Sequence, residues 1–258
     1  MSYQGDGVAL SLFGLEIRWY AVFIVTGMIL AIWLSSREAQ RRGIDSENIS
    51  DLALVMLPVA IVGARVWYVL FEWNNRYAQN PILIFDIRGG GLAIHGGIIA
   101  SLIVGAVFCK KRKLPFFRMA DIIFPYVALA QGIGRWGNFT NNEAFGGPTD
   151  LPWALIIDGQ KVHPTFLYES IGDVLICLLL IWFTRKKLRV DGQVAMWYLI
   201  GYGILRFFVE GLRTDSLMLG GLRVAQLISC AGILAGIAGL VLLSRRPPHS
   251  PDEDAPIQ

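Results

Sequence analysis

The stretch FLYESIGDVLICLLLIWFTRKKLR, residues 166–189, decides the class of fold. Residues 166–184 are largely apolar, and the basic cluster RKKLR at 185–189 follows directly. A run of about 18 to 20 apolar residues is long enough to cross the hydrocarbon core of a bilayer as a helix. Lysine and arginine beside such a run are typical of its cytoplasmic end. The stretch therefore predicts a transmembrane helix that ends in the cytoplasm.

Composition extends this prediction to the whole chain. Of the 258 residues, 54% are hydrophobic and 17% are charged, whereas soluble domains carry about 25% charged residues. Seven candidate spans follow from the bilayer-length criterion: 19–35, 51–71, 92–109, 119–139, 166–184, 193–210 and 222–243. We predict an all-α polytopic membrane protein with seven transmembrane helices.

Basic residues in alternate loops predict the orientation. They follow the first, third, fifth and seventh spans, as Arg37, Arg41 and Arg42, KKRK at 110–113, RKKLR at 185–189, and Arg245 with Arg246. The loops 72–91, 140–165 and 211–221 carry far fewer, so the N-terminus should lie outside and the C-terminus in the cytoplasm. Region 140–165 becomes a small extracytoplasmic loop region. This regular placement at helix ends favours topology signals over a nucleic-acid interface, so we expect no nucleic-acid partner.

The ends of the chain are predicted to differ from the helical part. Residues 1–244 should form one membrane domain, and the proline-rich polar tail at 245–258 should be a disordered cytoplasmic segment. No removable signal peptide is expected, because Asp6, Glu16 and Arg18 replace a basic leader. The three cysteines lie in or beside apolar spans without metal-type spacing, so we expect no disulfide framework.

Ionisable residues within the spans are candidates for function, because charge at membrane depth costs several kcal/mol. The set comprises Arg65, His95, Arg135, Glu143, Glu169, Arg206 and Glu210. When the spans alternate in direction, all seven fall in the outer half of the membrane, at the level of Tyr20. We therefore expect side chains from five helices to converge near the outer surface.

The sequence LRFFVEGLR, residues 205–213, predicts a cationic face. Arg206, Glu210 and Arg213 stand at i, i+4 and i+7, on one side of a helix, so Glu210 should orient both arginines. On a single isolated helix, this pattern would favour a purely structural ladder of ion pairs. With Arg65 and Arg135 at similar depth, the cations exceed the local glutamates, which favours an anionic partner. Arginine binds phosphate bidentately and keeps its charge.

Two further features leave alternatives open. The glycines at 132, 134 and 137 permit either close approach of a ligand or tight helix packing in lipid. His95 is suited to proton transfer near neutral pH, although a lone histidine more often only satisfies hydrogen bonds. No second histidine, cysteine or aspartate stands at metal-ligand spacing from it, so neither a metal nor another cofactor is expected.

Four motifs together resemble bacterial prolipoprotein diacylglyceryl transferases. They are GRWGNFTNNEAFG at 134–146, LAIHGG at 92–97, HPTFLYE at 163–169 and RFFVEGLR at 206–213. The first matches the Gly-Arg-x-Gly-Asn-Phe signature of that family, and the likeness runs from IRWY (17–20) to LRVAQLIS (222–229). Ala21 stands where the family has glycine, which leaves Tyr20 itself intact.

The resemblance implies an enzyme of the bacterial cytoplasmic (inner) membrane that acts in the first step of lipoprotein maturation. Its substrates would be phosphatidylglycerol and the lipobox cysteine in the signal peptide of a prolipoprotein, and its products a thioether and glycerol phosphate. The catalytic residues implied are His95 as base and Arg135 and Arg206 as phosphate ligands. The substrate-binding residues would be Tyr20, Arg65, Asn138, Glu143, Gly146, Glu169, Glu210 and Arg213, with Glu143 and Glu210 orienting arginines.

The competing hypothesis from the residues is a transporter or flippase for an organic anion or anionic lipid. Such a protein would also need buried arginines. Transporter folds usually show internal repeats and a site near the membrane midplane. The seven spans show no obvious halves, and their polar groups gather toward one face. Both observations favour the transferase.

Overall fold

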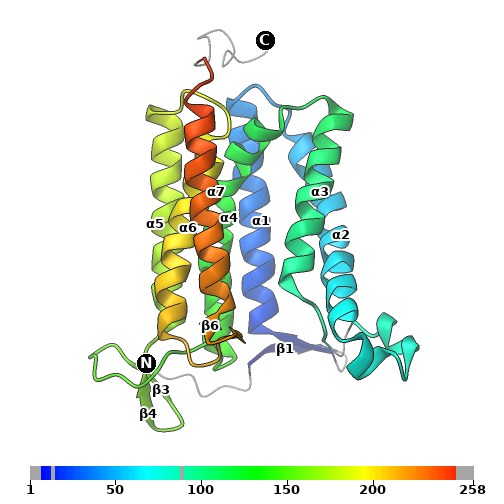
Figure 1. The fold of residues 1–258 in the computed structure, drawn as a ribbon, viewed down its shortest axis with the longest axis vertical. Helices are drawn as coiled ribbons and strands as arrows, with labels where there is room; N and C mark the ends of the chain where they lie inside the picture. Colours follow the sequence, from blue (N-terminus) through cyan, green and yellow to red (C-terminus); the bar gives the residue numbers. More distant parts are fainter. Residues whose placement is uncertain (1–6, 13–14, 88–89, 248–258) are drawn as a thin grey trace.

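Seven long helices dominate the computed structural model, which describes residues 7–12, 15–87 and 90–247 (Figure 1). They are α1 (Trp19–Arg41), α2 (Glu47–Phe71), α3 (Ile94–Arg112), α4 (Phe116–Thr140), α5 (Thr165–Lys186), α6 (Gln193–Leu212) and α7 (Val224–Leu243). All seven described helices are long and apolar enough to cross a membrane. The predicted polytopic all-α fold and all seven spans are confirmed.

Six of the seven described helices are longer than the apolar runs that predict them, whereas α7 begins two residues after the start of its predicted span. Helix α1 continues to Arg41 and α2 begins at Glu47, six and four residues beyond the predicted ends. Backbone hydrogen bonding does not stop at the edge of the hydrocarbon layer, because charged side chains of a further helical turn can remain in the polar interface. Hydropathy therefore locates each helix but underestimates the length of most of them.

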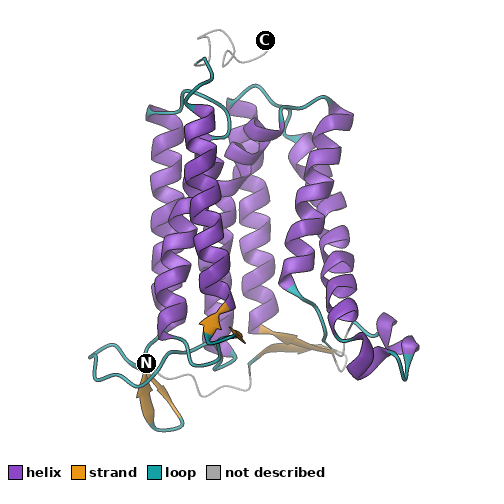
Figure 2. Cartoon of the chain, in the orientation of Figure 1, coloured by secondary structure: helices purple, strands orange, loops and turns teal. Residues whose placement is uncertain are grey.

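Short secondary structure gathers at one end of the bundle (Figure 2). Three antiparallel hairpins lie there, in which β1 (Val8–Leu12) pairs with β2 (Leu15–Arg18), β3 (Leu155–Ile157) with β4 (Gln160–Val162), and β5 (Met218–Leu219) with β6 (Leu222–Arg223). The π-helix η1 (Trp73–Tyr77) and the 3-10 helix η2 (Pro81–Phe85) belong to the loop between α2 and α3. This end carries the loops predicted to be extracytoplasmic, an orientation that stays a prediction.

Helix α4 is the central element of the bundle. It packs along α1 and α5 and also contacts α6, while α6 pairs with α7 and α2 pairs with α3. The α2–α3 pair makes few contacts with α1 and α4. The bundle thus consists of a tight five-helix group and a helix pair set against it, which leaves room for a cavity between them.

Glycine permits the closest helix contacts. A Cβ atom on Gly63 of α2 would lie 2.7 Å from the carbonyl oxygen of Gly96 on α3, and one on Gly137 of α4 would lie 2.6 Å from the Tyr20 ring. A Cβ on Gly132 would lie 3.0 Å from the carbonyl oxygen of Ser170. Between the two explanations for the intramembrane glycines, these contacts favour helix packing.

A polar network at the opposite end was not predicted. Asp121 of α4 is fully buried and accepts hydrogen bonds from the backbone N–H groups of Gly192 (2.7 Å) and Ala195 (2.9 Å). It thereby satisfies free N–H groups at the start of α6. Nearby, Asp191 binds Arg42 at 3.0 Å and Arg118 at 2.9 Å. These contacts fix the ends of α1, α4 and α6 relative to one another.

Several predictions about the termini fall outside the described residues. Of the predicted disordered tail 245–258, residues 248–258 lie outside them, as does Asp6. The domain boundary near 244 therefore stays a prediction. The cysteines of the described chain are free, with Cys109 and Cys177 buried and Cys230 exposed.

The glycine contacts predict opposite effects for one substitution at two sites on α3. Gly96→Ala should destabilise the protein by ~1–3 kcal/mol, because the new methyl group would meet the Gly63 backbone and the Trp67 Cβ. Gly105→Ala is the matched control, since its Cβ would lie 3.6 Å from Met56 Cε, an ordinary contact, and alanine favours the helix by up to ~1 kcal/mol. Thermal unfolding in nanodiscs distinguishes the two variants. A Gly96→Ala protein as stable as Gly105→Ala would contradict the packing described.

Candidate functional site

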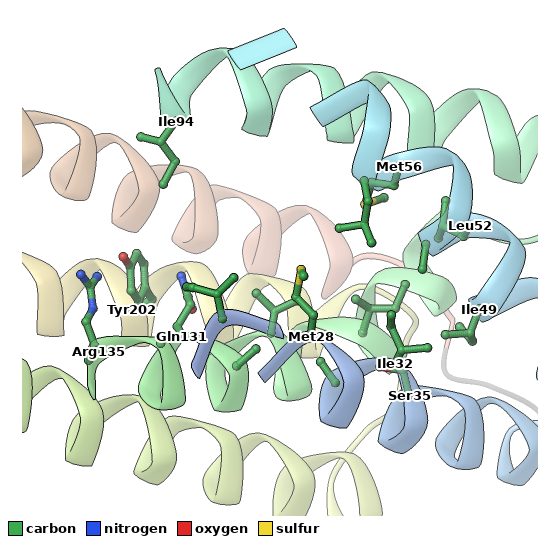
Figure 3. Close-up of a pocket in the computed structure, with 18 of the residues that line it drawn as sticks. Met28, Ile32, Ser35, Ile49, Leu52, Met56, Ile94, Gln131, Arg135 and Tyr202 are labelled. Carbon is green, nitrogen blue, oxygen red and sulfur yellow. The ribbon is translucent and has the colours of Figure 1, made fainter. Parts of the chain in front are cut away.

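A cavity of about 460 Å³ lies between the five-helix group and the α2–α3 pair (Figure 3). Most of its wall is apolar, with Met28 and Ile32 from α1, Leu52 and Met56 from α2, and Val127 from α4. Polar side chains gather at one end, where α1 begins and α4 nears its C-terminus. They are Tyr20, Gln131, Arg135, Asn138 and Tyr202. A long apolar cavity with a polar end matches the shape and chemistry of an amphiphile.

Four side chains from three helices form what we name the charge chain, defined as Arg135, Glu169, Arg206 and Glu210. Arg135 Nε of α4 lies 2.5 Å from Glu169 Oε2 of α5. The other oxygen of Glu169 accepts a hydrogen bond from Arg206 Nη1 of α6. Arg206 Nη2 donates to Glu210 Oε2 at 2.6 Å. Charges alternate along the chain, and both carboxylates are buried, so each glutamate is compensated by an arginine.

The two arginines of the charge chain differ in how many of their guanidinium nitrogens are bound to carboxylates. Arg206 uses both of its terminal nitrogens on carboxylates and is not part of the cavity wall. Arg135 contacts Glu169 through Nε, and neither of its terminal nitrogens donates a hydrogen bond to another described residue. Arg135 lines the cavity, and Figure 3 shows its guanidinium beside Tyr202. Arg135 therefore presents a free guanidinium edge to a ligand.

The prediction that Glu210 orients both Arg206 and Arg213 is only half right. Arg213 instead donates to Asp215 from Nε at 2.9 Å and from Nη2 at 2.8 Å, and these bonds hold the pKa of Asp215 below its ordinary value. Helix α6 ends at Leu212, and Arg213 has extended backbone angles of φ −72° and ψ 148°. Because Arg213 lies beyond the last residue of α6, its i, i+7 spacing from Arg206 does not place its side chain on the face of the helix.

Arg65 also differs from its predicted surroundings. It is buried, and its guanidinium donates to backbone carbonyls of the loop between α2 and α3. The acceptors are Leu83, Ile84, Asp86, Gly90 and Gly91. These bonds order the loop and use every nitrogen of the group. A role of Arg65 in substrate binding stays a prediction, and its contacts favour a structural role.

The expected excess of cations is absent from the charge chain itself, which contains two arginines and two glutamates, and Arg213 pairs with Asp215. Arg65 pairs with no carboxylate of the described chain, but its guanidinium is fully engaged by carbonyls of the loop. What favours an anionic ligand is the unused guanidinium edge of Arg135, rather than surplus charge.

Glu143 and Gly146 lie in the segment that follows α4. Glu143 was expected to orient an arginine, but its Oε1 accepts from Asn138 Nδ2 at 2.9 Å and from Asn141 Nδ2 at 3.3 Å. Across residues 7–12, 15–87 and 90–247 it forms no ion pair with an arginine. Gly146 donates its N–H to the His163 carbonyl at 2.9 Å, and a Cβ there would lie 2.6 Å from His163 Cβ. Glu143 thus orients Asn138, and Gly146 anchors the loop.

His95 lies in the first turn of α3, directly after Ile94, which lines the cavity. In Figure 3, Ile94 lies toward the same end as Arg135. The imidazole is half-buried and makes no hydrogen bond or ion pair with the rest of the described chain. Its nitrogens therefore remain free for a proton transfer, although His95 itself is not part of the cavity wall.

Several polar residues around the site were not predicted from the sequence. Gln131 accepts a hydrogen bond from the Tyr198 hydroxyl at 2.8 Å, and Tyr198 stacks on Tyr202 with ring centroids 5.7 Å apart. Asp173 is fully buried, and its oxygens have no hydrogen-bond partner in the described chain. Helical spacing gave a usable signal, because these residues lie four positions from one another or from members of the charge chain.

The fold and the site define a class: a polytopic membrane protein with an apolar cavity between its helices and an arginine at the polar end of that cavity. Comparison with known proteins identifies the family. The family model described as prolipoprotein diacylglyceryl transferase matches residues 7–242. The chain belongs to the prolipoprotein diacylglyceryl transferase family.

Relatives that carry the name phosphatidylglycerol–prolipoprotein diacylglyceryl transferase include proteins from three different genera. The Finegoldia magna protein is 56% identical over 232 residues, which cover 90% of this chain and 93% of the relative. The Clostridioides difficile protein is 49% identical over 249 residues, covering 96% and 100%. The Synechococcus elongatus protein is 48% identical over 242 residues, covering 88% and 83%.

The charge chain predicts that the stability of the folded protein depends strongly on Glu169, which pairs with both Arg135 and Arg206. Glu169→Gln removes the charge that compensates Arg135 and Arg206 and turns an amide N–H₂ toward a guanidinium, so we expect a loss of about 3 kcal/mol. Asp215→Asn is the control, because its ion pair with Arg213 is exposed on the carboxylate side and should contribute less than ~1 kcal/mol. Thermal unfolding of both variants in nanodiscs measures the difference. Equal, small effects would show that the buried carboxylate is dispensable.

Proposed function

We propose that this chain transfers the diacylglyceryl group of phosphatidylglycerol to the thiol of a lipobox cysteine in the signal peptide of a prolipoprotein. The reaction takes place in the bacterial cytoplasmic membrane and releases glycerol phosphate. Family membership and the names of the relatives support the reaction. The single observation that carries it in this chain is the free guanidinium edge of Arg135 at the polar end of an apolar cavity.

The shape of the cavity supports one orientation of the lipid. The phosphodiester lies against Arg135, and the acyl chains follow the apolar wall toward Ile49 and Leu52. Arginine pairs with phosphate through two parallel hydrogen bonds, for which the terminal nitrogens of Arg135 are free. Tyr20 and Asn138 line the same end and hydrogen-bond to the headgroup.

The orientation of the bundle supports access of the protein substrate. The polar end of the cavity lies with the loops that carry few basic residues, and the clusters at 110–113 and 185–189 lie at the other end. By the positive-inside rule, the polar end faces the extracytoplasmic side. A secreted prolipoprotein presents its lipobox at that side of the membrane.

The proposed step is a displacement at carbon. The thiolate sulfur attacks the glyceryl carbon that bears the phosphate, the new S–C bond forms, and the C–O bond to phosphate breaks. The electron pair leaves with the phosphate oxygen, so glycerol phosphate gains a second negative charge. Arg135 is the catalytic residue that stabilises this charge, and preorganised stabilisation of this kind is often the largest contribution to catalysis.

The thiol proton needs an acceptor, because a free cysteine has a pKa of ~8.5 and only its thiolate is an effective nucleophile. His95 supplies it: the imidazole lies at the cavity end of α3 and has no other hydrogen-bond partner in the described residues. A positioned general base contributes ~10²–10⁴-fold to rate.

The remaining charged residues act through Arg135 and Asn138. Glu169 fixes the Arg135 guanidinium through Nε, Arg206 fixes Glu169, and Glu210 fixes Arg206. Arg206 is therefore a positioning residue rather than the direct phosphate ligand expected from the sequence. Glu143 positions Asn138. Gly146, Arg65 and Arg213 support the loops at the polar end.

The competing transporter or flippase is not favoured. A transporter alternates access to a site near the membrane midplane, whereas the polar residues of this cavity gather toward one end. The family and the named relatives also point to transfer chemistry.

Arg135→Lys tests the phosphate contact. Lysine keeps the charge but cannot offer two parallel donors, so thioether formation should fall at least ~100-fold while the protein remains inserted and folded. Mass spectrometry of a lipobox peptide incubated with phosphatidylglycerol measures the product. Arg112→Lys is the matched control, because Arg112 pairs with Asp51 at the opposite end and should retain activity. Full activity of Arg135→Lys would overturn the assignment.

His95→Gln tests the base. Thioether formation near neutral pH should fall ~100-fold or more, and it should recover as the pH approaches the ~8.5 at which the thiol ionises unaided. His163→Gln, in the loop beside Tyr168, is the control and should behave like wild type. A His95→Gln enzyme that keeps its neutral-pH rate and shows only a displaced pH profile would assign the base to another group.

A further inference from the structure

A second cavity, of about 330 Å³, lies at the opposite end of the bundle, where α1 and α5 end. We name it the basic pocket. It is lined by Arg41, Arg42, Thr184, Arg185, Lys186, Lys187 and Leu188. The proposed transferase reaction uses none of these residues, so the pocket needs its own explanation.

Positive charge in the basic pocket is only partly compensated. Arg41 pairs with Glu38 at 2.8 Å, and Arg42 Nη2 pairs with Asp191 at 3.0 Å. Arg185, Lys186 and Lys187 form no ion pair with any described residue. Three uncompensated cations on one concave wall repel one another, and a bound anion would relieve that repulsion.

Arg42 gives a second, independent indication of a ligand. Its residue is only 5% exposed, yet its Nη1 atom has no hydrogen-bond partner in the described chain. A buried charged donor without an acceptor costs free energy. An oxygen-rich anion in the adjoining pocket would supply the acceptor, and phosphate matches arginine and lysine together.

The positive-inside rule explains why basic residues lie at this end, but not how they are arranged. The rule counts lysine and arginine in loops. It requires neither a concave wall nor a buried arginine with an unused donor. The cluster at 110–113, which lies in the last turn and C-cap of α3 at the same end, contributes no residue to the basic pocket.

We propose that the basic pocket binds a phosphate group, carried by an anionic phospholipid of the surrounding leaflet or by a soluble phosphate. Arg42 and the uncompensated Arg185, Lys186 and Lys187 are its ligands. The site stands apart from the transferase cavity, and its occupancy ties the ends of α1 and α5 together.

Thermal unfolding of the full chain in phosphatidylcholine nanodiscs tests the proposal in two arms. One arm adds phosphatidylserine to the nanodiscs, and the other adds inorganic phosphate to the buffer. Binding to the folded state should raise Tm by ~2–4 °C in the lipid arm if the ligand is a headgroup, or in the phosphate arm if it is soluble.

Paired variants separate the pocket from general surface charge. Lys186→Gln with Lys187→Gln should abolish the Tm increase, whereas Lys110→Gln with Lys111→Gln removes the same charge at the same end and should leave it intact. All four lysines are exposed and lie at the C-terminal end of α3 or α5. Both double variants should therefore fold. An equal loss in the two variants, or no Tm increase in either arm, would overturn the proposal.

Discussion

The site depends on one interaction, the bridge that the buried Glu169 carboxylate makes between Arg135 and Arg206. In the low dielectric of a helical bundle an unpaired charge is very costly, and an alternating chain of charges is tolerated because each member is compensated. The bridge joins α4, α5 and α6, so it aligns the three helices as well as their side chains. It also sets the direction in which Arg135 can act, since Nε is engaged and the terminal nitrogens face the cavity.

The sequence predicted the helices well because bilayer thickness imposes a length that hydropathy can detect. It also predicted which helices bring ionisable groups to one end, through the alternation of basic loops. It failed to predict the partners of side chains whose positions are determined by tertiary contacts. Arg213 does not lie on the face of α6 because the helix ends one residue before it. Arg65 donates to backbone carbonyls of an irregular loop, and hydrophobic periodicity cannot predict the conformation of such a loop. The pairing of Glu169 with two arginines needs coordinates, because its partners lie on separate helices.

The family resemblance and the physical reading of the residues contributed different parts of the account. The motifs identified the chemistry, while charge and depth alone favoured only an anionic partner. The structure then distinguished the two arginines that the motifs treat alike. Arg135 lines the cavity and binds Glu169 only through Nε, whereas both terminal nitrogens of Arg206 bind carboxylates. The structure also separated the polar end of the large cavity from the basic pocket at the other end of the bundle.

The most direct measurement of the central claim follows both products of one reaction. The purified protein is incubated with phosphatidylglycerol labelled in its headgroup glycerol and with a lipobox peptide. One labelled glycerol phosphate should be released for each thioether-linked diacylglyceryl peptide formed. Peptide that stays unmodified, while the protein carries an organic anion across proteoliposomes, would contradict the proposed transfer.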